Sequence, residues 1–253
     1  MWIYTALILL IFFLLGYLFI GFFSNPSFIM AMVLFWGSVF VAIVLTLIFN
    51  LLDTAKERSI DIAKVLIGVI DKRDPNLNGH SRQVQDVTML LYNALPHNIR
   101  NDINPISLQY AALMHDVGKL GIPESILNKP AKLDPEEWEI MRTHPKLGVD
   151  LLRSLNTFDE ISDWILYHHE RIDGNGYYKI KAEDIPLPSK IIAVADTYSA
   201  ITMRRSYKEP RLHEDAIDII TEVAGTQLDR ELVDIFITIP KENLVATLPE
   251  SCM

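Results

Sequence analysis

Two side chains that bind divalent metals stand side by side in the segment Leu113-Met114-His115-Asp116-Val117-Gly118-Lys119. Imidazole and carboxylate together suit ions of intermediate hardness, and one carboxylate can bridge two ions. Asp116 is the candidate bridge. Neighbours on a helix diverge by about 100°, so His115 and Asp116 can share a site only at a helix edge or end. We expect Gly118 to supply that end.

By itself the pair is a weak signal, because buried histidines and aspartates are more often hydrogen-bonded structural residues than ligands. The chain strengthens it with further candidates at separated positions, namely His80, His144, His168, His169 and Asp196. Structural alternatives exist for most of them: His80 could open a helix, His144 could be a turn residue, and Asp196 could be a buried aspartate. Adjacent His168 and His169 are harder to explain in this way, since two imidazoles on an apolar helix need partners.

The segments that must position these residues have helical patterns and no convincing strand pattern, which predicts an all-α fold. Asn104 with Pro105, and Asp134 with Glu137, are typical helix starts. Residues 119–133 and 171–188 are expected to be loops. The expected helices cover residues 51–70, 80–94, 105–115, 135–143, 145–155, 158–169, 189–204, 212–224 and 229–236.

Residues 1–52 contain no Asp, Glu, Lys or Arg, so the whole net charge of −9 lies beyond them. Two apolar runs, 2–23 and 28–49, are each long enough to span about 30 Å of hydrocarbon. They flank a short polar turn and predict a two-helix transmembrane hairpin. A cleavable signal peptide fits poorly because no positive segment precedes the first run, and a buried soluble hairpin fits poorly because both helices are apolar all round.

Lys56, Arg58 and Lys64 follow the second run, whereas the turn has no basic residue. The N-terminus and the remaining chain are therefore predicted to be cytoplasmic, with the protein in the cell membrane. Residues 53–72 form a linking helix that could mediate a homodimer or be the first core helix. A catalytic domain at 73–240 and a tail at 241–253 follow. The acidic balance argues against binding polymeric nucleic acid, and the single cysteine, Cys252, excludes an intrachain disulfide.

From about Ser59 to Phe236 the sequence resembles the HD-GYP subgroup of the HD-domain metal-dependent phosphohydrolases. The matching motifs, in chain order, are Arg73-Asp74-Pro75, Gly79-His80-Ser81, His115-Asp116-Val117-Gly118-Lys119, Ile122-Pro123, His144-Pro145 with Gly148, His168-His169-Glu170-Arg171-Ile172-Asp173-Gly174-Asn175-Gly176-Tyr177, Ile185-Pro186, Ala195-Asp196-Thr197-Tyr198, and Gly225-Thr226-Gln227 with Asp229.

The resemblance implies an HD-type helical bundle with two divalent metal ions, iron or manganese, in its core. One ion would be held by His80, His115, Asp116 and Asp196, and the other by His144, His168 and His169, with Asp116 bridging. Lys119, Arg205 and Lys208 would contact the substrate phosphate. The implied activity is a membrane-anchored phosphodiesterase that opens cyclic di-GMP, or a close cyclic dinucleotide, to linear pGpG or GMP.

Several positions depart from the subgroup pattern. Tyr178 replaces the proline after Gly176-Tyr177, and Ser199 replaces a common aspartate that could orient a metal-bound water or a lysine. Ser206 replaces a proline, and Asn76 stands where some members have an acidic residue associated with a third metal. The departures at Tyr178 and Ser199 favour one alternative, a catalytically weakened nucleotide receptor or scaffold. Hydrolysis of another nucleotide by the same centre is a further alternative.

Overall fold

The computed structural model describes residues 11–12, 15–16, 19, 28–73, 79–153, 156–203 and 210–249. The chain divides into two compact units, Met1–Ile62 and Ala63–Met253. The described residues are helical and contain no strand, apart from an isolated bridge between Ala224 and Leu228. The all-α prediction is therefore confirmed.

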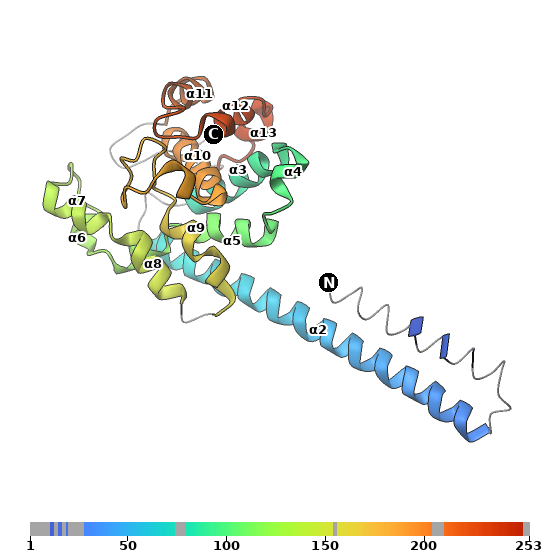
Figure 1. Cartoon of the computed structure of the whole chain (residues 1–253). Helices are drawn as coiled ribbons and strands as arrows, with labels where there is room; N and C mark the ends of the chain where they lie inside the picture. Colours follow the sequence, from blue (N-terminus) through green and yellow to red (C-terminus); the bar gives the residue numbers. More distant parts are fainter. Residues whose placement is uncertain are drawn as a thin grey trace. The chain divides into compact units, whose positions relative to one another are not determined.

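Helix α2 runs Phe28–Arg73 and covers both the second predicted span and the predicted linking helix (Figure 1). Among the described residues it holds the one stretch, Phe35–Leu52, that is long and apolar enough to cross a membrane, with a mean hydropathy of 2.3 and none of it buried. This is a matter of length and composition, and a signal sequence or a soluble core helix can meet the same criterion. Most of the first predicted span, 2–23, and the turn after it lie outside the described residues, so the hairpin stays a prediction.

The second unit is centred on three helices: α3 (His80–Ala94), α5 (Pro105–Met114) and α10 (Leu187–Thr202), with α3 packed against both of the others (Figure 1). Buried residues recur along α3 at helical spacing, which gives it one core-facing side. They are His80, Ser81, Gln83, Val84, Val87, Thr88 and Leu91. On α10 ten of the sixteen residues are buried. The core therefore surrounds α10, which carries Asp196.

Two predicted helix starts are confirmed by their caps. The Asn104 side chain accepts hydrogen bonds from the backbone N–H groups of Ile106 and Ser107 at the start of α5. At the start of α7 (Pro135–Met141), Asp134 and Glu137 form a reciprocal capping box. Helix α8 (His144–Leu152) follows and packs against the short 3₁₀ helix η2 (Val117–Gly121).

Two expected segments differ from the structure. The predicted loop 119–133 contains the end of η2 and helix α6 (Glu124–Leu127). The predicted helix 158–169 is a 3₁₀ helix, η3 (Asn156–Ile161), followed by α9 (Ser162–Leu166), and it stops before the two histidines. His168 Nδ1 lies 2.6 Å from the carbonyl oxygen of Ile165, which a continuing helix would pair with the N–H of His169. A local side-chain hydrogen bond therefore replaces the next helical one.

The later chain completes the bundle. Helices α11 (His213–Glu222) and α12 (Arg230–Phe236) match their predicted segments. The stretch 171–188, predicted to be a loop, contains η4 (Ala182–Asp184) and the first two residues of α10. Besides α6, the helices α4 (His97–Arg100) and α13 (Lys241–Val245) were not expected. Leu244 of α13 is fully buried, so residues assigned to a tail contribute to the core.

Candidate metal centre

The structure brings all seven predicted ligands together from five segments of the second unit. His80 is the first residue of α3, and His144 is the first residue of α8. His115 and Asp116 follow the end of α5, His168 and His169 follow α9, and Asp196 lies within α10. Five are buried and exposed by no more than 2%, namely His80, His115, Asp116, His144 and His168, while His169 and Asp196 are half-buried.

The candidate ligand atoms form two groups that share Asp116. One group contains His80, His115 and Asp116, and the other contains Asp116, His144, His168 and His169, with all ligand atoms of a group within 4.8 Å of one another. Asp116 Oδ1 lies 3.2 Å from His144 Nε2 in one group, and Oδ2 lies 3.3 Å from His115 Nε2 in the other. The two oxygens therefore face different groups, an arrangement that suits a bridging carboxylate.

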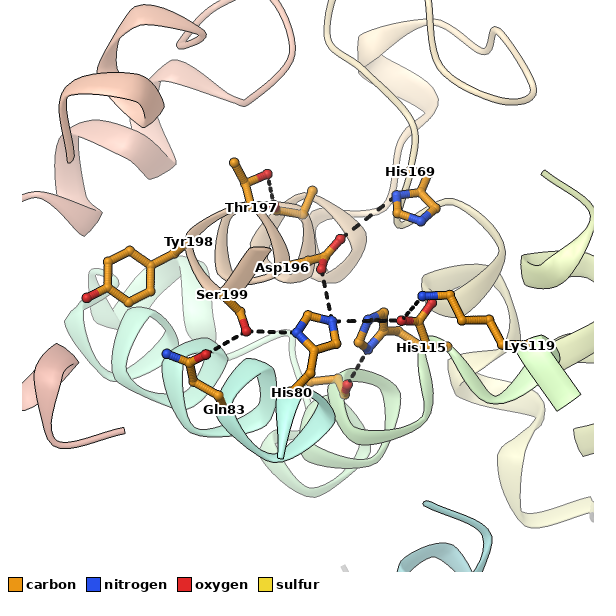
Figure 2. Close-up of polar contacts among 12 residues, drawn as sticks. His80, Gln83, His115, Lys119, His169, Asp196, Thr197, Tyr198 and Ser199 are labelled. Atoms are coloured by element: carbon orange, nitrogen blue, oxygen red, sulfur yellow. Dashed lines mark hydrogen bonds and ion pairs between the residues drawn. The ribbon is translucent and has the colours of Figure 1, made fainter. Parts of the chain in front are cut away.

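Asp196 connects the same two groups on their other side. Its Oδ1 lies 3.3 Å from His80 Nε2, and its Oδ2 lies 4.0 Å from His169 Nδ1 (Figure 2). Its carboxylate thus faces one histidine of each group, whereas the resemblance placed it with the His80 group alone.

Three imidazoles are oriented by carbonyl oxygens three residues before them. His115 Nδ1 lies 2.7 Å from Ala112 O, His144 Nδ1 lies 2.9 Å from Met141 O, and His168 has the equivalent bond to Ile165. A carbonyl oxygen can only accept, so Nδ1 must carry the proton in each ring. The Nε2 lone pair of each neutral ring is left free and faces the group.

Four buried atoms of the site have no hydrogen-bond partner: Nε2 of His115, His144 and His168, and Oδ1 of Asp116. Unpartnered buried polar atoms cost about 1–3 kcal/mol each, so such a cluster needs an explanation. Converging imidazole lone pairs and carboxylate oxygens, with no thiolate, are the donor set of a divalent cation. These residues therefore fit a metal ion.

The pKa values favour the protonation state that a metal requires. Burial lowers the pKa of His169 to about 3 and lowers the pKa of His168 well below its ordinary value. Burial alone would raise the pKa of Asp116, but Lys119 and His115 outweigh it and hold that pKa well below its ordinary value. His115 is the exception: burial opposes its protonation, but the Asp116 carboxylate raises its pKa overall. At neutral pH the carboxylate is charged and His168 and His169 are neutral.

Lys119 pairs with the candidate bridge. Its Nζ lies 2.6 Å from Asp116 Oδ2, with the lysine side chain 17% exposed and the aspartate 3% exposed. The other two predicted substrate contacts, Arg205 and Lys208, lie outside the described residues, as does Ser206.

The prediction that Gly118 ends the helix before it was wrong. Helix α5 already ends at Met114, and Gly118 is not among the glycines with positive φ in the described chain. A Cβ at Gly118 would lie 1.8 Å from the carbonyl oxygen of His144 and 2.4 Å from the backbone nitrogen of Gly148. Gly118 is required because η2 and α8 approach backbone to backbone, which brings His144 close to Asp116.

The sequence reasoning assigned no role to Glu170, whose side chain organises the loop after the paired histidines. Glu170 is only 5% exposed and accepts hydrogen bonds from the backbone N–H groups of Tyr178, at 2.5 Å, and Ile180, at 3.1 Å. A proline has no N–H, so Tyr178 supplies a bond that the proline of the subgroup pattern could not make. The sequence signal for this role was a carboxylate placed just before a glycine-rich loop, whose backbone N–H groups need acceptors.

Tyr177 was quoted only as part of a motif, but it lies at the edge of the centre. Its ring centroid is 4.7 Å from that of His169, and the guanidinium carbon of Arg142 lies 5.6 Å from the same centroid. Burial raises the pKa of Tyr177, so its hydroxyl stays protonated. An aromatic face and a guanidinium thus border the histidine cluster.

The sequence matches the HD domain family over residues 64–232. It is 36% identical over 197 residues to a probable cyclic di-GMP phosphodiesterase from Vibrio cholerae, covering 71% of this chain and 44% of the relative. It is 41% identical over 138 residues to a cyclic di-GMP phosphodiesterase from Thermotoga maritima, covering 53% and 38%. This chain therefore spans less than half the length of these curated relatives.

The fold also resembles solved structures. One of a cyclic GMP-AMP specific phosphodiesterase from V. cholerae superposes with a TM-score of 0.54 at 17% identity, covering 75% of this chain and 51% of that one. At that identity the likeness concerns the fold alone. With the family match, the curated relatives and the helical bundle in agreement, this chain belongs to the HD domain family and, within it, to the HD-GYP subgroup that its motifs resemble.

Proposed function

We propose that this chain is a membrane-anchored, metal-dependent phosphodiesterase that hydrolyses cyclic di-GMP, or a close cyclic dinucleotide, to linear pGpG or GMP. One observation carries the proposal: buried, unpartnered histidine nitrogens converge on both oxygens of Asp116. Relatives of the same family named as cyclic dinucleotide phosphodiesterases support the substrate class.

Two divalent ions, iron or manganese, would be held by seven side chains. His80, His115 and Asp116 would bind one with Asp196, and His144, His168 and His169 would bind the other, with Asp116 shared. When bound, divalent cations acidify a water molecule and offset the negative charge of a phosphodiester. Imidazole and carboxylate ligands without thiolate suit iron and manganese.

The remaining residues would bind and orient the nucleotide. Lys119 neutralises Asp116 in this structure, and with the metal ions bound its ammonium group would contact a phosphate oxygen. Tyr177 presents a ring beside His169 on which a nucleobase could stack. Arg205 and Lys208 would grip the phosphate. We therefore assign Asp116 and Lys119 as the catalytic residues.

The membrane assignment rests on the first 64 residues of the sequence. Two spans, 2–23 and 28–49, would place the N-terminus and the catalytic domain in the cytoplasm, because basic residues follow the second span and are absent from the turn. The helix that follows could pair with a second copy of the chain. Protease protection of an N-terminal tag in sealed inverted vesicles would contradict this topology, because a cytoplasmic N-terminus faces outward there.

The test is turnover by the purified full-length chain, loaded anaerobically with Fe²⁺ or Mn²⁺. We expect hydrolysis of cyclic di-GMP that Asp116→Ala abolishes and that Asp150→Ala, which removes an exposed carboxylate on α8, leaves unchanged. Hydrolysis of cyclic GMP-AMP in place of cyclic di-GMP would keep the enzyme and replace its substrate. Metal binding and nucleotide binding without turnover would favour a receptor instead.

A further inference from the structure

His80 is oriented differently from the three histidines that pair with a preceding carbonyl. Its Nδ1 lies 2.8 Å from the hydroxyl oxygen of Ser199, a residue 119 positions away on α10 (Figure 2). Ser199 in turn lies 2.6 Å from Gln83 Oε1. Both His80 and Gln83 are on α3, and all three side chains are exposed by no more than 2%. Side chains buried this fully are shielded from bulk water.

The donor and the acceptor of each hydrogen bond in this network can be assigned by starting from Thr202. The Thr202 hydroxyl lies 3.0 Å from the carbonyl oxygen of Tyr198, which can only accept, so Thr202 donates its one proton there. Thr202 must then accept from Gln83 Nε2, at 3.3 Å. The Gln83 amide is thereby oriented with Oε1 toward Ser199.

Ser199 has one hydroxyl proton, and Gln83 Oε1 can only accept it. Ser199 therefore accepts from His80, so His80 Nδ1 must carry a proton. His80 Nε2 is left facing Asp196 Oδ1 at 3.3 Å and Asp116 Oδ2 at 3.8 Å. Three electron-rich atoms meet at this point, which is where a cation would lie.

We propose that Ser199 and Gln83 are positioning residues that hold His80 as an Nε2 ligand through an uncharged hydrogen-bond relay. The inference rests on the proposed metal centre, and it explains the departure at Ser199. A carboxylate at this position would need a donor from Gln83, whereas Gln83 presents its oxygen. The relay thus orients His80 without the negative charge of an aspartate. Gln83, Ser199 and Thr202 each supply the donor or acceptor that the neighbouring side chain needs.

The first test needs no substitution. In the isotopically labelled, metal-free, full-length chain at neutral pH, nitrogen NMR of the imidazoles reports which ring nitrogens carry protons. We expect a proton on Nδ1 of His80. An unprotonated Nδ1 would overturn the relay, whatever the behaviour of any variant.

The second test is a titration of the full-length chain with Mn²⁺ alone, followed by electron paramagnetic resonance of the free ion. Ser199→Ala should weaken one class of Mn²⁺ site by about 10–100-fold, the usual cost of losing a partner behind a metal ligand, and leave the other unchanged. Ser199→Thr keeps the hydroxyl and should restore binding. The matched control is Ser189→Ala, which removes another fully buried hydroxyl from α10 that bonds only to backbone carbonyls of 163 and 164.

A folded Ser199→Ala chain that binds Mn²⁺ as tightly as the unsubstituted chain would overturn the relay, as would equal weakening by Ser189→Ala. If Ser199→Ala does not fold, the NMR measurement decides. The outcome is separable from the proposed function: weakened binding in Ser199→Ala together with no turnover of any cyclic dinucleotide would overturn the activity and keep the relay. Absence of Mn²⁺ binding by the unsubstituted chain would overturn the metal centre and the relay together.

Discussion

Four histidines of the candidate centre are oriented by two different means. His115, His144 and His168 each pair Nδ1 with a carbonyl oxygen three residues earlier, inside their own turn. His80 pairs Nδ1 with a side chain 119 residues later, and that side chain depends on a second one. Three histidines therefore depend on local backbone geometry, whereas His80 depends on the packing of α3 against α10.

Because of this difference, a side-chain substitution can disturb the orientation of His80 more easily than that of the other three histidines. No side-chain change removes a backbone carbonyl, so the three local histidines keep their orientation as long as their turns form. His80 loses its orientation when one hydroxyl is removed from another helix. The two halves of the centre, the group with His80 and His115 and the group with His144, His168 and His169, share Asp116. Changes at Asp116 or its immediate supports should therefore affect both halves.

The largest effect is expected from Gly118→Ala, which would disrupt the half that contains His144. Its methyl group would meet backbone atoms of His144 and Gly148, which cannot move aside. We expect a loss of about 3 kcal/mol or more in the free energy of unfolding, measured with urea. At Gly121, in the same 3₁₀ helix, a methyl would meet only the end of the Leu147 side chain, so Gly121→Ala is the matched control. Equal losses in both variants would contradict the backbone contact.

A smaller effect is expected from Lys119→Met, which acts on the carboxylate shared by both halves. Without metal, Lys119 is the ammonium partner of a buried Asp116. Its removal should lower the stability of the metal-free chain by about 2 kcal/mol, because a charged hydrogen bond is lost and a buried charge is left without it. Added Mn²⁺ should recover most of that stability. Destabilisation that persists with Mn²⁺ would show that Lys119 stabilises the chain by packing and not by neutralising the charge of Asp116.

The next effect is on the pH dependence of stability, to which His169 and His115 should contribute with opposite signs. The pKa of His169 is about 3 in the folded chain, below the ordinary 6.5, so between these values the unfolded chain binds the extra proton. Stability from this group is therefore complete above pH 6.5 and falls as the pH decreases toward 3, by at most about 1.4 kcal/mol per pH unit. Urea midpoints of the metal-free chain at pH 7.5 and 5.5 measure this loss. His169→Gln should reduce it, and an unchanged pH dependence would contradict the assignment. His115 has a raised pKa and contributes in the opposite direction.

The smallest effect is expected from Tyr178→Pro, which lies outside both halves. The substitution removes the hydrogen bond from the Tyr178 N–H to Glu170 and stiffens the loop, so the two contributions partly cancel. We expect a net loss of about 1 kcal/mol in unfolding free energy and unchanged Mn²⁺ affinity. Tyr178→Phe keeps the N–H and serves as the control. Weakened Mn²⁺ binding by Tyr178→Pro would extend the centre to this loop.

Several elements were predictable because their signals are local. The caps at Asn104 and Asp134 each involve residues two or three positions apart, and both were identified from sequence. The helix expected to reach His169 was not, because the hydrogen bond of His168 to Ile165 ends it earlier. The buried role of Glu170 was missed since it requires the loop to fold back over eight to ten residues.

The sequence by itself determined the residue types of the centre, the family and the helical class, because ligand chemistry and helical spacing are both properties of short segments. Only the tertiary structure decided that Asp116 faces both groups, that Gly118 permits a backbone contact, and that Ser199 with Gln83 orients His80. Each of these depends on atoms from segments tens of residues apart. Their distance and direction are set by how the helices pack, and no local pattern records that packing.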